Sequence, residues 1–178
     1  MTDRDRKILL TLHPIVAARA SNVLYRCEQA GIACGLFSGL REFYEQHDLF
    51  KNGRTLINGI WVITDRSKIV TYSDAGGSFH EYGLAIDLVQ KKHINAKIID
   101  FTWDSFVDNN KDLINDWDQV GKIAEDEGFF WGKRFKNIVD LPHFQYTCGL
   151  DIKQVQFIYS TSGMSGVWET ITQLSKIT

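Results

Sequence analysis

Two histidines and two aspartates in this sequence have the types and order expected of a metal-dependent hydrolytic site. His80 and Asp87 lie in the run SFHEYGLAID, and Asp140 and His143 lie in the later run DLPHF. A catalytic zinc site takes three protein ligands from His nitrogens and carboxylate oxygens, and keeps a fourth position open for water or substrate. His80, Asp87 and His143 could supply the three ligands. Asp140 would then be placed to take a proton from the metal's water.

The residue types alone leave a structural interpretation open, because a lone His or Asp is usually a surface or hydrogen-bonded residue. Spacing adds a geometric condition. The seven-residue gap puts His80 and Asp87 on one face of a helix but on opposite faces of a straight strand. If Asp87 lies on a strand, His80 must approach from the preceding loop, with a turn at Tyr82–Gly83.

Apolar spacing predicts three helices around these residues. The first begins at Pro14, continues through Cys27 and stops at Gly31; the second covers 41–51 and closes at Gly53; the third covers 116–127 and ends at Gly128. His13 fits the start of the first helix. After Cys148 we expect a tail of one or two short helices that packs on the rest of the chain through Val167, Trp168, Ile171 and Leu174.

Short apolar runs predict strands at 32–37, 60–63, 68–72 and 84–89. In the last run, alternation places Leu84, Ile86 and Leu88 on one face and Asp87 on the other. The segment 74–78 reads as a loop, because paired glycines permit backbone angles that other residues avoid. The sequence therefore predicts that Asp87 lies on a strand that follows a glycine-rich loop.

Length and composition favour a single globular domain over residues 1–178. The 178 residues carry a net charge of −2, without the strongly basic balance typical of a nucleic-acid partner. Three cysteines, Cys27, Cys34 and Cys148, form no CxxC pair, so we expect reduced packing residues. The apolar stretch 8–12 is too short for a signal-peptide core or a membrane span. We therefore expect no signal peptide, synthesis in the cytoplasm, no stable membrane association and a monomer.

Several motifs in order resemble one peptidase family, that of the D-alanyl-D-alanine carboxypeptidases and the L-alanyl-D-glutamate endopeptidases of phage endolysins. Its Ser-x-His-x-x-Gly-x-Ala-x-Asp and Asp-x-Pro-His-Phe signatures match 78–87 and 140–144. The stretch 38–54, with SGLR, EQ and LFKNGR, is similar to the phage enzymes' Gly-x-Arg, Glu-Gln and Leu-Tyr-x-x-Gly-Arg stretch, and 128–132 to their Gly-Phe-x-Trp-Gly segment. Independent motifs in the same order are more specific than any single one. The resemblance covers about 38–145.

The resemblance implies a role for each matching residue. His80, Asp87 and His143 would bind Zn²⁺, Asp140 would act as the general base, and Arg41 would assist at the substrate carbonyl oxygen. Gln46, Ser78 and Trp131 are further substrate-binding candidates, for each of which a purely structural role stays open. The implied fold is α+β, a single domain with a small antiparallel sheet and flanking helices.

Two positions depart from the family pattern. The glycine pair common after the family's Trp is Gly132-Lys133 here, and the Glu that usually follows His-Phe is Gln145. Neither position is a proposed ligand. Gln145 could still tune the metal, because groups around the ligands orient them.

The implied function is cleavage of the L-alanyl-D-glutamate bond in the stem peptide of bacterial peptidoglycan by a phage-type endolysin, which a holin would release to the wall. Two alternatives stay open. A D,D- or L,D-carboxypeptidase of the same family would share the motifs, and a non-catalytic zinc-binding or wall-binding module would share the fold.

Overall fold

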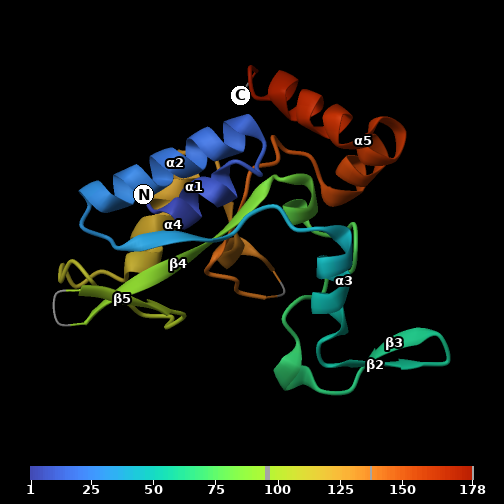
Figure 1. Ribbon diagram of the computed structural model, residues 1–178, viewed down its shortest axis with the longest axis horizontal. Coiled ribbons are helices and arrows are strands. Elements are labelled where there is room, and N and C mark those ends of the chain that lie inside the picture. Colours follow the sequence, from blue (N-terminus) through green and yellow to red (C-terminus); the bar gives the residue numbers. More distant parts are fainter. Residues whose placement is uncertain (95–96, 137, 178) are drawn as a thin grey trace.

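The protein folds around one antiparallel sheet, with helices packed against it, and so has the predicted α+β architecture (Figure 1). The computed structural model describes residues 1–94, 97–136 and 138–177. The five-stranded sheet runs in the order β1 (Cys34–Ser38), β4 (Ala85–Ile94), β7 (His143–Gln145) and β6 (Phe130–Trp131), and β5 (Lys97–Thr102) also pairs with β4. The long β4 strand is therefore the axis of the sheet, since three strands pair with it.

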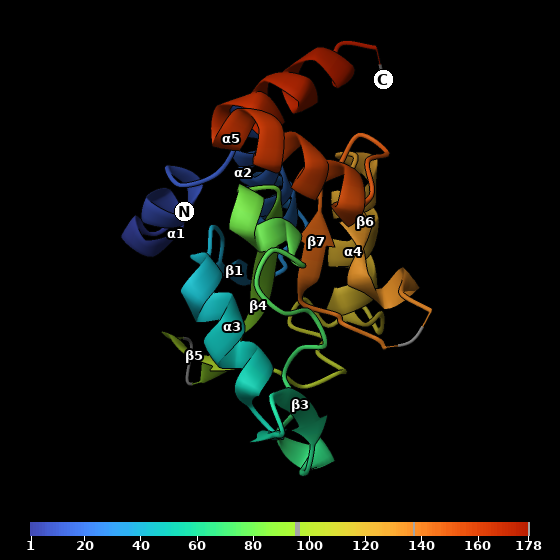
Figure 2. The same ribbon diagram turned by 90° about the vertical axis from the view of Figure 1, so that its right-hand side faces the viewer.

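Three helices lie close together on one side in Figure 1: α1 (Asp3–Leu9), α2 (Pro14–Gln29) and α4 (Asp116–Asp126). The kinked helix α5 (Ile152–Leu174) crosses the opposite end of the molecule from the hairpin of β2 (Arg54–Ile57) and β3 (Ile60–Ile63) (Figure 2). Helix α3 (Phe43–Lys51) leads into that hairpin. Short 3-10 turns are η1 (Arg66–Lys68), η2 (Phe79–Tyr82) and η3 (Gly132–Arg134). In the described part of the chain, no helix combines the length and apolarity needed to cross a bilayer.

The core forms where the inner faces of α2 and α4 meet the sheet. Its buried members come from α2 (Val16, Ala20, Val23, Cys27), from the sheet (Leu36, Ile86, Leu88, Phe144) and from α4 (Trp117, Val120, Ala124). Strand β4 is buried on both faces, since Ala85 and Val89 are as inaccessible as Ile86 and Leu88. Asp87 is the exception among these positions, because it is only half-buried.

The predicted helices occur, with their ends set by local chemistry. His13 caps α2, because its ring Nδ1 accepts the N–H of Ile15 at 3.2 Å, and Pro14 occupies the first turn, where its missing N–H costs nothing. The tail packs as expected: Val167 and Ile171 are fully buried, and Trp168 donates its ring N–H to the Tyr82 carbonyl at 2.9 Å. It forms one helix bent at Gly163.

The strand predicted at 68–72 is wrong. Lys68 ends the turn η1, which Asp65 starts by accepting the N–H of Ser67, and the next residues join no sheet. The Thr71 carbonyl accepts a hydrogen bond from the Arg54 guanidinium. This segment is thus held by side chains, and Val70 and Tyr72 stay exposed.

Sequence reasoning also missed several short elements: α1, β2, β5, β6 and β7. Strand β6 has only two residues and strand β7 only three, which is too few for a periodic pattern to indicate them.

Candidate metal centre

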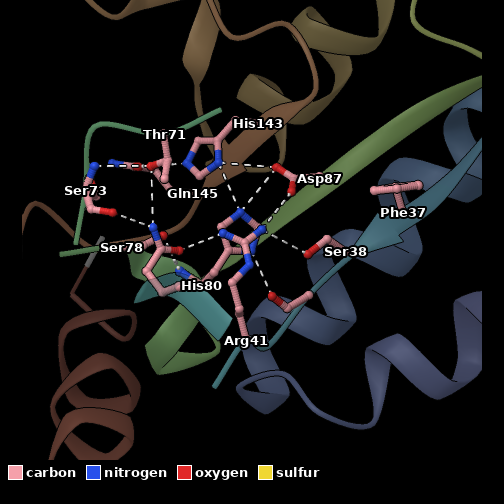
Figure 3. A network of polar contacts seen from close by, with 12 residues as sticks. Phe37, Ser38, Arg41, Thr71, Ser73, Ser78, His80, Asp87, His143 and Gln145 are labelled. Atoms are coloured by element: carbon pink, nitrogen blue, oxygen red, sulfur yellow. Dashed lines mark hydrogen bonds and ion pairs between the residues drawn. The ribbon is translucent and has the colours of Figure 1, made fainter. Parts of the chain in front are cut away.

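Three side chains from separate segments converge at the end of β4 (Figure 3). The Nε2 of His80 lies 3.2 Å from the Oδ1 of Asp87 and 3.2 Å from the Nδ1 of His143. The third side of this triangle, from His143 Nδ1 to Asp87 Oδ1, is 3.4 Å. These residues are the predicted ligand set, brought together from positions up to 63 residues apart.

Sheet pairing places two of the three. Asp87 on β4 stands directly opposite His143 on β7, so neighbouring strands hold their side chains together. His80 comes from the turn η2, which ends at Gly83 with a backbone φ of 67°. Only glycine adopts this left-handed conformation without steric cost, and it turns the chain into β4. The condition derived from the seven-residue spacing, an approach of His80 from outside the strand, is therefore met.

The outer ring nitrogens of both histidines face oxygen acceptors. Nδ1 of His80 lies 2.8 Å from the Gly39 carbonyl, and Nε2 of His143 lies 3.1 Å from the Oε1 of Gln145. A neutral imidazole that donates through one nitrogen carries a lone pair on the other. The inner nitrogens and the Asp87 carboxylate then point three lone pairs at one another. Such a group requires a cation or protons between its members.

The spacing fits a metal ion. Bonds of about 2.0–2.2 Å to a tetrahedral ion, as zinc makes with His and carboxylate ligands, place neighbouring ligand atoms about 3.3–3.6 Å apart. The observed sides of 3.2, 3.2 and 3.4 Å lie close to these values. Donation from each metal-binding His to a carbonyl or amide oxygen is also the usual support around such a site.

The charges of the three groups stabilise one another. Burial alone would raise the pKa of Asp87, but the two imidazoles outweigh it and hold this pKa well below its usual range. Burial alone would lower the pKa of His143, but the hydrogen bond and charge of Asp87 raise it. The Asp87 carboxylate is therefore ionised and available as a ligand.

Arg41 stands beside the cluster on the segment between β1 and α3. Its Nη2 lies 3.6 Å from the Oδ2 of Asp87, and its Nη1 donates to the Oε1 of Gln46 at 2.7 Å. Gln46 is fully buried, and its amide nitrogen donates to the Ser73 carbonyl at 2.7 Å. Arg41 also closes on the cluster through its backbone, because its N–H donates to the His80 carbonyl. Gln46 thus fixes the Arg41 guanidinium beside Asp87.

Asp140 lies three residues before His143, in the loop that follows η3. Its backbone N–H bonds to the Gly132 carbonyl, and its own carbonyl accepts the N–H of His143. Burial raises the pKa of its carboxyl group, and the charge of Asp87 raises it further, against the opposing effect of His143. The loop thus carries a partly buried carboxyl whose affinity for a proton is higher than usual.

Ser78 and Trp131 support the cluster from outside it. Ser78 caps η2, where its Oγ accepts the N–H of His80. Trp131 is 2% exposed and donates its ring N–H to the Leu141 carbonyl at 2.8 Å, two residues before His143. A Cβ atom added at Gly121 of α4 would come within 2.2 Å of the Trp131 ring. Trp131 is thus wedged between α4 and the loop that carries Asp140 and His143.

Three further supporting groups escaped the sequence analysis. Glu81 accepts the N–H groups of Gly76 and Ser78 and so closes the glycine-rich loop, and the Ser-x-x-Glu spacing of a capping box could have indicated it. The Ser38 hydroxyl accepts from Arg41, and the Gly39 carbonyl orients His80. A backbone carbonyl leaves no trace in a sequence, so Gly39 could not have been identified.

A groove of about 680 Å³ lies next to Arg41, lined by Ile8, Phe37, Ser38, Gly39, Leu40, Glu45, Asp48, Leu49 and Asn52. It combines apolar walls with two carboxylates and one guanidinium. A peptide with charged and apolar groups could be bound in such a groove.

Known proteins resemble this chain in sequence and in fold. A family model described as D-alanyl-D-alanine carboxypeptidase matches residues 71–146. The peptidoglycan L-alanyl-D-glutamate endopeptidase CwlK of Bacillus subtilis (strain 168) is 36% identical over 142 residues, which cover 80% of this chain and 77% of CwlK. The crystal structure of the Serratia marcescens L-Ala D-Glu endopeptidase ChiX matches with a TM-score of 0.52 at 19% identity, over 83% of this chain and 89% of ChiX.

Proposed function

Because the chain belongs to the peptidase family of D-alanyl-D-alanine carboxypeptidases and L-alanyl-D-glutamate endopeptidases, we propose that it is a zinc-dependent peptidase that hydrolyses the L-alanyl-D-glutamate bond of peptidoglycan. The observation that carries the proposal is the triangle of His80, Asp87 and His143 in a chain 36% identical to an enzyme named for that bond. We infer the metal from the ligand types and spacing, and the bond from the relative.

The metal would be held by Nε2 of His80, Oδ1 of Asp87 and Nδ1 of His143. A zinc ion there would act as a Lewis acid and lower the pKa of a water molecule from about 15.7 to about 7. Gly39 and Gln145 would keep both imidazoles in the tautomer that turns a lone pair inward.

Asp140 would serve as the general base. Its carboxylate takes a proton from the attacking water as the new C–O bond forms at the scissile carbonyl carbon. The protonated Asp140 then gives this proton to the leaving nitrogen as the C–N bond breaks, which leaves a carboxylic acid and an amine; transfer of the acid's proton to the amine gives the carboxylate and ammonium products. The shared loop of Asp140 and His143 supports this role, since it fixes the base relative to a ligand.

Arg41 would act on the substrate. Its guanidinium is always charged and can stabilise the oxyanion that develops on the carbonyl, or hold a carboxylate of the stem peptide. The hydrogen bond that Arg41 donates to Gln46 fixes the guanidinium in one position. We propose that Gln46, Ser78 and Trp131 act by positioning, and that the groove beside Arg41 receives the peptide.

The biological setting follows from the resemblance alone. We propose a monomeric endolysin of a phage or prophage, made in the cytoplasm and released to the wall with the help of a holin. No observation on the described residues favours a nucleic-acid partner.

The deciding experiment is mass spectrometry of purified peptidoglycan after digestion by the zinc-loaded protein. We expect new N-terminal D-glutamate, with L-alanine left on the muramyl group. Free D-alanine without a new glutamate amine would instead make the protein a carboxypeptidase. If the protein bound one zinc ion but hydrolysed neither bond, it would be a non-catalytic zinc-binding module. Digestion by an Asp140→Asn variant is the matched control for contaminating hydrolases.

A further inference from the structure

Three aromatic side chains form an exposed cluster on the sheet near the metal centre. Phe37 comes from β1, Phe101 lies at the end of β5, and Trp103 follows that strand. The rings of Phe37 and Trp103 meet edge to face, with centroids 4.8 Å apart and planes at 84°. The three side chains are 40%, 42% and 53% exposed, respectively. We call this cluster the aromatic platform. Exposed apolar patches of this kind commonly mark places where a ligand or a partner binds.

The aromatic platform lies on the face of the sheet that carries the metal ligand Asp87. Side chains alternate between the two faces of a strand, so Asp87 and Lys91 share one face of β4. Phe101 pairs with Lys91 and therefore lies on that face. Ser38 pairs with Asp87, and Phe37 is the residue before it, where the register of β1 shifts in a bulge (Figure 3). The platform thus continues the surface on which the metal centre stands.

Arg4 of α1 holds two of the rings in place. Its guanidinium carbon lies 4.9 Å from the centre of the Phe37 ring and 5.2 Å from that of the Phe101 ring, and its Nη2 donates to the Phe37 carbonyl at 2.9 Å. A cation over the face of a ring is attracted by the π electrons. Among the described residues, none accepts a hydrogen bond from the Trp103 indole N–H. The rings are therefore fixed before a ligand binds, and one donor is available to it.

The surroundings of the aromatic platform favour part of the substrate as its occupant. Phe37 also lines the groove beside Arg41, so the platform and the groove are continuous. A second copy of the chain bound there would block the groove. A sugar suits such a surface, because its C–H groups stack on the face of an aromatic ring while its hydroxyl groups hydrogen bond to a donor such as an indole N–H.

The position of the platform fits the sugar of peptidoglycan. In that polymer, one alanine and a lactyl ether separate the L-alanyl-D-glutamate bond from the muramyl ring, and two such units span about 7 Å when extended. Phe37 is one residue from the pairing partner of Asp87. Thr102, the residue before Trp103, pairs with Gln90, three residues from Asp87. These steps along the sheet correspond to roughly 3–10 Å.

We propose that the aromatic platform binds the N-acetylmuramyl sugar of the glycan strand while the attached stem peptide occupies the metal centre. This inference rests on the proposed cleavage of the L-alanyl-D-glutamate bond. It makes Phe37, Phe101 and Trp103 specificity-determining residues, which favour a stem peptide that is still attached to its sugar over the same peptide without it.

Rates on two substrates test the inference in the full, zinc-loaded chain. One substrate is a muramyl tripeptide, and the other is the same peptide with an acetyl group in place of the sugar. We expect kcat/KM of the wild type to be at least 10-fold higher for the first. Trp103→Ala should bring this ratio close to one, and Trp103→Phe, which keeps a ring, should retain most of it. The matched control is Phe157→Ala, which removes a 69% exposed aromatic side chain from α5 and should leave the ratio unchanged.

A binding measurement separates the sugar site from the peptidase activity. Saturation-transfer NMR uses the disaccharide of N-acetylglucosamine and N-acetylmuramic acid, which carries no stem peptide. Its sugar protons should receive saturation from the aromatic protons of the wild type and lose it in Trp103→Ala, at an unchanged melting temperature. Such transfer without hydrolysis of either substrate would support the sugar site and refute the proposed peptidase function.

Three results would overturn the inference. The first is an equal kcat/KM of the wild type for the two substrates, and the second is the absence of saturation transfer to the disaccharide. The third is a dimer in sedimentation that Trp103→Ala converts to a monomer, since the aromatic platform would then be an interface between copies of this chain.

Discussion

The peptidase centre and the loop at 108–119 are held together in opposite ways. The centre takes His80, Asp87 and His143 from three segments, and each donor atom is held by a strand pairing or a hydrogen bond to its neighbour. The loop is held by hydrogen bonds among its own residues, such as those from the N–H groups of Asp112 and Leu113 to the Asp108 carboxylate, and Lys111 and Leu113 adopt left-handed φ angles. A centre assembled across the fold depends on the packing of the whole domain, whereas a loop closed by its own residues depends only on local contacts. Four substitutions test this difference.

The largest effect is expected for His143→Ala. A three-ligand centre that loses one ligand leaves two donors, so zinc should fall from one per chain to near zero and peptidoglycan hydrolysis should become undetectable. Metal analysis by mass spectrometry, together with turbidity loss of purified sacculi, measures both. The control is His47→Ala, because His47 bonds to Asp74 outside the centre. Full zinc occupancy in the His143 variant would show that His143 is not one of the metal ligands.

Asp140→Asn should lower activity by about 100-fold to 10,000-fold and leave zinc content unchanged, since a general base contributes this much and does not bind the metal. Rates on a defined muropeptide, measured beside metal content, separate the two effects. Asp126→Asn, which changes an exposed carboxylate paired with Arg26, should leave both unchanged. A rate near wild type for the Asp140 variant would assign the proton transfer to another group.

Gln145 tests whether support around the ligands matters as much as the ligands' own placement. Gln145→Leu removes the acceptor for His143 Nε2, and losses of about 10–100-fold in metal affinity are typical for such contacts. Gln145→Glu is the matched variant, because it keeps an acceptor and should hold zinc at least as tightly as the wild type. Competition against a chromophoric chelator gives both affinities. Equal zinc affinities for the two variants would show that the hydrogen bond to His143 Nε2 does not contribute to metal binding.

The smallest effect is expected for Leu113→Gly in the loop. Leu113 is 90% exposed, so little packing is lost, and glycine tolerates its left-handed φ. The free energy of unfolding should rise by up to about 1 kcal/mol. Leu10→Gly is the control: Leu10 is 86% exposed but has a φ of −65°, so the same change should destabilise the protein by about 0.5–1 kcal/mol. Urea denaturation measures both, and a loss of stability in both would mean that the loop carries no strain.

The same contrast explains what could be predicted from the sequence. Helices α2, α3 and α4 followed from apolar spacing, and the ligands from a match to family motifs. The pairing of Asp87 with His143 could not be derived, because β7 has three residues and no pattern of its own. The segment 68–72 was mistaken for a strand, because its apolar residues are exposed and its carbonyls are bonded by side chains, which periodicity does not reveal. The Asp and Asn residues of 108–112 are visible in the sequence, but the hydrogen bonds that fold the chain back on Asp108 emerge only from the structure.

The contact between Gly121 and Trp131 sets a rule for how this protein can change during evolution. No Cβ fits at position 121 while an indole occupies position 131. A lineage that gains a side chain on α4 here must also exchange Trp131 for something smaller, and thereby gives up the hydrogen bond to the Leu141 carbonyl. We therefore expect a side chain at position 121 only in relatives that carry a smaller residue than Trp at position 131, whereas Gly121 tolerates either.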